Sequence, residues 1–74
     1  MDYYLFLTNI YKDKATHIIE NLLKHYFKVK SVDFEINNKK SIMRIQGHEL
    51  SPLKIQSTIN ELGYNCKGIQ KDDQ

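Results

Sequence analysis

The chain has 74 residues, of which 41% are hydrophobic and 27% charged, and its formal net charge is +2. This length predicts one domain, and this composition argues against a disordered chain. The sequence holds no apolar run long enough to span a membrane and no signal-peptide pattern. Its single cysteine, Cys66, excludes an internal disulfide. We expect a cytoplasmic protein with one domain over residues 1–74, a core of about 3–70 and a frayed tail at 71–74.

The first half of the chain predicts a strand followed by a helix. Residues 3–10 are aromatic and aliphatic nearly throughout, which is typical of a central strand. From Lys12 the apolar spacing becomes helical, and Asp13 lies where a carboxylate favours a helix start. The predicted buried face of this helix consists of Ala15, Ile18, Ile19, Leu22, Leu23 and Tyr26.

A hairpin is predicted next. Val32, Phe34 and Ile36 alternate with polar residues, as in a half-buried strand. Residues 37–40 read as a tight connection, because asparagine tolerates a left-handed backbone. The returning strand, 41–47, places Met43 and Ile45 on one face, so the two strands form a hairpin.

A second helix and a last strand complete the chain. Ser51 and Pro52 form a helix start, with a hydroxyl N-cap followed by proline at the first helical position. Gly63 lies where a helix ends in a left-handed residue, and residues 64–69 alternate like a short strand. The predicted buried face of this helix is Leu53, Ile55, Ile59 and Leu62.

The element order is therefore β-α-β-β-α-β. Each β-α-β half crosses over right-handedly, which places two helices on one face of a four-stranded antiparallel sheet. The predicted fold class is α+β, a ferredoxin-like sandwich.

From Leu5 to Ile69 the chain resembles the heavy-metal-associated (HMA) domain family of copper chaperones and N-terminal modules of metal-pumping ATPases. The resemblance rests on Ile19-Glu20 in the first helix, residues 29–32 entering the second strand, and Gly63-Tyr64 after the second helix. It covers nearly the whole chain.

The family's diagnostic motif, Met-x-Cys-x-x-Cys, is absent. Aligned on Ile19-Glu20, its methionine position holds Ile10 and its two cysteine positions hold Lys12 and Ala15. Two thiolates in this motif hold a soft ion such as Cu(I), whereas a protonated lysine offers no lone pair. We therefore expect a degenerate metal site, no cofactor and no tight metal binding.

The resemblance implies a docking surface that survives the loss of the ligands. In the family, docking uses the metal-site turn, the first helix and the tip near the last strand. We expect a protein-interaction or regulatory module that is not an enzyme and whose partner is another protein, without membrane or nucleic-acid binding. The matching residues form the candidate contact surface: Tyr11, Lys12, Lys14, His17 and Tyr64.

Three alternatives stay open at this point. Cys66 from two chains would bind metal weakly between molecules, which requires an exposed thiol. An RNA-recognition (RRM) reading of residues 5–10 requires Tyr4, Phe6 and their neighbours to face solvent on the open sheet. Finally, Lys12 and Lys14 flank Asp13 at the helix start, where free N–H groups would accept an anion, or are simply solvated surface charges.

Overall fold

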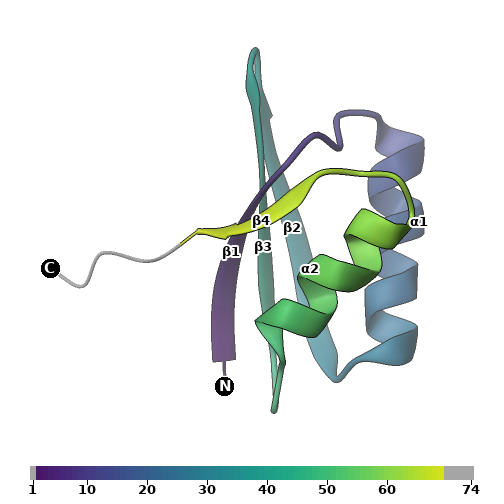
Figure 1. The fold of residues 1–74 in the computed structure, drawn as a ribbon, viewed down its shortest axis with the longest axis vertical. Coiled ribbons are helices and arrows are strands. Elements are labelled where there is room, and N and C mark those ends of the chain that lie inside the picture. The colour runs from purple at the N-terminus through teal and green to yellow at the C-terminus, as the bar shows by residue number, and fades with distance from the viewer. Residues whose placement is uncertain (1, 70–74) are drawn as a thin grey trace, which may run out of the picture.

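The computed structural model describes residues 2–69, and the predicted tail at 71–74 lies outside them. Its elements follow the predicted order (Figure 1). They are β1 (Asp2–Thr8), α1 (Asp13–Tyr26), β2 (Val29–Asn37), β3 (Lys40–Gly47), α2 (Pro52–Glu61) and β4 (Cys66–Ile69). Neither helix within these residues is long and apolar enough to cross a membrane.

The four strands form one antiparallel sheet in the order β2-β3-β1-β4. As predicted, β1 is central, and both helices cover the same face of the sheet (Figure 1). The register places Thr8, at the end of β1, opposite Ser41 of β3 and Cys66 of β4. This pairing brings the connection after β1 next to the beginnings of β3 and β4. The ferredoxin-like sandwich is confirmed.

The core lies between the sheet and the helices. Met43 and Ile45 of β3 are fully buried, as their predicted alternation requires. Phe6 of β1 and Ile10, just beyond it, join them. Partly buried side chains close the margins of this core: Tyr4, Ala15, Leu22, Phe27, Phe34 and Tyr64.

The predicted inward face of α1 is wrong at two positions. Ile19 and Leu23 are fully buried, whereas Ile18 and Tyr26 are exposed, Tyr26 by 71%. Helix α1 packs against β2, an edge strand of the sheet. Only a narrow stripe, repeating every four residues, therefore reaches the core, and its flank faces solvent.

The buried face of α2 is also narrower than predicted. Ile55 and Ile59 are fully buried, but Leu53 is 75% exposed and Leu62 is also exposed, contrary to the prediction. This helix packs against β4, the strand at the other edge. Two helices on a sheet of this size each bury one stripe, so apolar residues beside that stripe stay in water.

Two local signals are confirmed. Ser51 is the N-cap of α2, and its hydroxyl accepts a hydrogen bond from the Lys54 backbone N–H at 3.4 Å, with Pro52 as the first helical residue. Gly63 has a φ of +99°, in the left-handed region. Two strands are shorter than predicted: β1 ends at Thr8 rather than residue 10, and β4 begins at Cys66 rather than residue 64.

Candidate functional site

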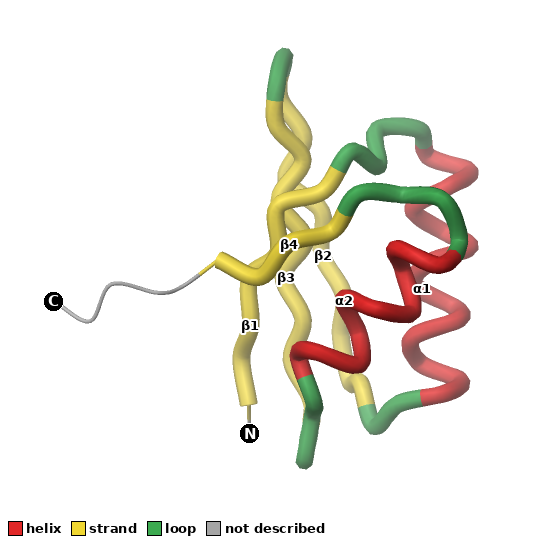
Figure 2. The backbone as a smooth tube through the Cα atoms, viewed as in Figure 1, coloured by secondary structure: helices red, strands yellow, loops and turns green. Residues whose placement is uncertain are grey.

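Three connections meet at one end of the molecule, which we call the loop end. They are the β1–α1 loop, residues 9–12; the β2–β3 turn, residues 38–39; and the α2–β4 loop, residues 62–65. Figure 2 shows all three as loops toward the same end of the molecule, with the β2–β3 turn at its tip. The β1–α1 loop includes Lys12, at one of the positions where the HMA motif would place a cysteine.

A buried hydroxyl pair holds the base of the β1–α1 loop. The Thr8 Oγ1 atom lies 2.9 Å from the Ser41 Oγ atom and accepts a hydrogen bond from the Ile10 backbone N–H at 3.2 Å. Ser41 in turn donates its hydroxyl proton to the Ile10 carbonyl oxygen at 2.6 Å. Both side chains are buried, so these bonds satisfy backbone groups that water does not reach. They end β1 at Thr8 and direct the chain toward α1.

Two asparagines join the β1–α1 loop to the α2–β4 loop. The Asn9 Oδ1 atom accepts a hydrogen bond from the Asn65 backbone N–H at 2.8 Å, and the Asn9 backbone N–H donates to the Asn65 carbonyl oxygen at 3.3 Å. The Asn60 Oδ1 atom accepts from the Cys66 N–H at 2.9 Å. The two loops are thus tied together by the protein's own groups. Sequence reasoning missed Asn9, whose only signal is its place directly after a strand.

The candidate contact residues are only partly brought together. Tyr11, Lys12 and Tyr64 line one shallow hollow, together with Asn9 and Ala15. Tyr11 is exposed, and its hydroxyl donates to the Lys39 carbonyl oxygen at 3.3 Å, which links this hollow to the β2–β3 turn.

Lys14 and His17 lie apart from that hollow. Both are exposed on α1, and neither belongs to the lining residues. Lys12 is the N-cap residue of α1 and makes no side-chain capping bond, so its ammonium group is not used to hold the helix end.

The two side chains at the cysteine positions of the motif, Lys12 and Ala15, offer no ligand for a soft metal ion. Lys12 is exposed, and Ala15 carries only a methyl group, partly buried against the core. Among residues 2–69 no three His, Cys, Asp or Glu side chains gather closely enough to hold a metal ion.

Cys66 does not meet the requirement for a ligand shared between two chains. Its side chain is only 5% exposed and belongs to the core. Burial also raises the pKa of the thiol from 9.0 to about 11, because the thiolate would lose its hydration. A thiolate is the form that binds metal, so the folded chain disfavours it at neutral pH.

The RRM reading also fails its own requirement. Phe6 is fully buried beneath the helices, and Tyr4 packs against the same core. Tyr4 and Phe6 are two residues apart, so they share one face of β1, and that face is the one covered by the helices. The open face of β1 instead carries Tyr3, Leu5 and Leu7.

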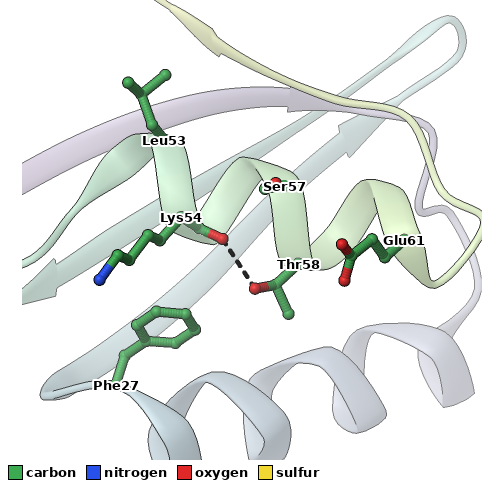
Figure 3. A pocket seen from close by; sticks show the side chains of 6 residues that line it. All are labelled: Phe27, Leu53, Lys54, Ser57, Thr58 and Glu61. Carbon is green, nitrogen blue, oxygen red and sulfur yellow. Dashed lines mark hydrogen bonds between the residues drawn. The ribbon is translucent and has the colours of Figure 1, made fainter.

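A further hollow lies between α2 and the end of α1 (Figure 3). The Phe27 ring faces α2 there, while the Leu53 side chain points away from it. The hydroxyl of Thr58 donates to the Lys54 carbonyl oxygen at 2.8 Å, so it is already used within the helix. This hollow contains none of the candidate contact residues.

No family model matches the chain, and no curated protein matches it significantly. Among solved structures, the chain is similar to the N-terminal domain of ZntA, determined in solution in its Zn(II) form. The two share a TM-score of 0.74 and 14% sequence identity over 96% of each chain. At this identity the likeness shows the fold, and the resemblance to HMA domains is confirmed at that level.

Proposed function

We propose that this chain is a non-catalytic protein-docking module of HMA-like fold, which binds its partner through the loop end without a metal ion. The docking face consists of Tyr11, Lys12, Lys14, His17 and Tyr64. A regulatory role follows if docking occupies a site that a metal-carrying relative would use.

The single observation that carries this proposal is the internal bonding of the β1–α1 loop. Thr8, Ser41 and Asn9 hold the loop with hydrogen bonds of 2.6–3.3 Å that involve no metal ligand. A loop that is already ordered loses little conformational entropy on binding, which favours association. The exposed Tyr11 supplies an aromatic side chain of the kind that is enriched in protein interfaces, and Lys12, which lines the same hollow, supplies a charge suited to the polar rim of an interface.

The metal arm of the proposal is tested by anaerobic titration of the reduced protein with Cu(I) and with Zn(II), followed through amide chemical shifts. We expect no saturable shifts at residues 9–17 or 62–68. Saturable one-to-one shifts centred on Cys66 and the β1–α1 loop would mean that the site is rebuilt from other ligands, and would contradict docking without metal.

The docking arm is tested by site-specific photo-crosslinking in the cells that make the protein. A photoreactive residue replaces Tyr11 in one variant and Leu53 in a control. Leu53 is even more exposed than Tyr11, 75% against 44%, but lies at the start of α2, away from the loop end (Figure 1). We expect a defined protein adduct from position 11 only, which Lys12→Glu with Lys14→Glu removes. Equal adducts from both positions would refute a specific docking face.

A further inference from the structure

A second hollow lies at the loop end, on the other side of Asn9. Residues of β1, β4 and the β2–β3 turn line it. Asn9 lines both this hollow and the one beside Tyr11. Asn65 also lines it, so the bonded pair of asparagines separates the two. None of the candidate contact residues lines this second hollow.

The second hollow combines apolar surface with positive charge. Leu7 lines it and is 39% exposed, because its side chain lies on the face of β1 that the helices do not cover. Three lysines line it as well, namely Lys39, Lys40 and Lys67. Lys67 and Leu7 are register partners on β4 and β1, so a charge stands directly beside the leucine.

These lysines have no carboxylate to neutralise them within residues 2–69. The ion pairs there use Lys24, Lys28 and Arg44 instead. Segments 8–16, 37–41 and 63–68, which surround the two hollows, together hold five lysines and a single carboxylate, Asp13. These lysines repel one another and give the loop end a positive electrostatic potential. An anion that binds there is attracted by this potential and reduces the repulsion.

We propose that this second hollow binds an acidic peptide segment of a partner protein. An apolar side chain of the segment packs against Leu7, and carboxylates on either side of it meet Lys40 and Lys67. Among residues 2–69, none that lines the hollow is aromatic or an arginine, so these residues do not supply the stacking surface that single-stranded nucleic acids use. We infer this site independently of the docking face, since different side chains form it.

The probe is a fluorescein-labelled peptide in which one leucine is flanked by glutamates, compared with the same peptide carrying serine in place of leucine. Binding is measured by fluorescence anisotropy and by amide shifts of the labelled protein at low salt. We expect shifts at residues 7–9, 39–41 and 65–67, and weaker binding of the serine peptide. Equal binding of the two peptides, or shifts confined to other residues, would overturn the proposal.

Charge-reversal variants distinguish binding at the second hollow from attraction of the peptide to the net positive charge of the protein. Lys40→Glu with Lys67→Glu is expected to raise the Kd about tenfold or more, equivalent to about 1.4 kcal/mol. The matched control, Lys30→Glu with Lys54→Glu, changes net charge equally at exposed lysines that do not line the second hollow, and should change the Kd less than about twofold. An equal increase of the Kd in both variants would show that binding depends on net charge alone, and would refute the site.

Two further measurements keep the outcome decisive. Lys39 lies in the turn between β2 and β3, outside the paired residues of the two strands. The variant Lys39→Glu therefore tests the same hollow if the double variant fails to fold. An oligothymidylate of the same charge as the peptide tests nucleic acid. Tighter binding of the oligonucleotide, weakened by the same lysine variants, would assign the hollow to nucleic acid and overturn the peptide proposal.

Discussion

Replacing Ser41 with alanine tests whether the buried hydroxyl pair orders the β1–α1 loop. Ser41 is fully buried and belongs to β3 rather than to the loop itself. Its hydroxyl accepts a hydrogen bond from the Thr8 hydroxyl and donates one to the Ile10 carbonyl oxygen. The substitution removes the donor to the Ile10 carbonyl oxygen, 2.6 Å away, and one of the two acceptors near the Thr8 hydroxyl. The other acceptor, the Ser41 carbonyl oxygen at 3.2 Å, remains.

The expected cost follows from the group left without a partner. A buried polar group that loses its hydrogen bond costs about 1–3 kcal/mol. Because Thr8 keeps one acceptor, the Ile10 carbonyl carries most of this penalty. A domain of this length has a free energy of unfolding of about 4–11 kcal/mol, so the loss is a large share of the total.

Urea unfolding followed by circular dichroism measures the loss, and native-state amide exchange locates it. We expect Ser41→Ala to lower the free energy of unfolding by about 1–3 kcal/mol and to speed exchange of the Ile10 amide more than that of amides in β3. Ser57→Ala is the control, because Ser57 is exposed on α2 and alanine favours a helix. A Ser41→Ala midpoint equal to that of wild type, with unchanged exchange at Ile10, would refute the role given to this pair.

Three further outcomes follow from burial and backbone geometry. Ile19→Ala should cost about 2–5 kcal/mol, whereas Ile18→Ala, one residue away but exposed, should cost far less by the same urea assay; similar losses would contradict the observed helix face. Gly63→Ala should cost about 1–2 kcal/mol from its φ of +99° alone, since no atom lies within 4 Å of the added Cβ; Gly68→Ala, whose Cβ meets an ordinary contact at 3.6 Å, is the control, and equal effects would exclude backbone strain. Because burial raises the pKa of the Cys66 thiol from 9.0 to about 11, its contribution to stability is present below pH 9 and lost as the pH rises through 11; Cys66→Ala should therefore lose less stability than wild type over that range, and parallel pH profiles would count against a buried thiol.

Local signals determined the order of the elements and the two ends of α2. The Ser51-Pro52 start of α2 and the left-handed Gly63 depend on interactions within a few residues, so the sequence predicts them directly. The alternation that buries Met43 and Ile45 is likewise local. The loss of both cysteines from the motif positions, now Lys12 and Ala15, is also a statement that needs no coordinates.

Tertiary structure decided which of several apolar residues reach the core. Ile18 and Leu53 satisfy the helical spacing but lie on flanks that no element covers, because each helix packs over an edge strand. The burial of Cys66 and Phe6, two side chains that the metal and RNA alternatives require to be exposed, depends on the side of the sheet that the helices occupy.

The loop end itself is also a product of long-range contacts. Asn9 and Asn65 are separated by 56 positions in the sequence, and Thr8 and Ser41 by 33, yet each pair is hydrogen-bonded. Periodicity and capping act over one or two turns of chain, so they carry no information about such pairs. The antiparallel pairing of β1 with β3 and β4 brings these residues together, and with them the lysines of the turn and of β4.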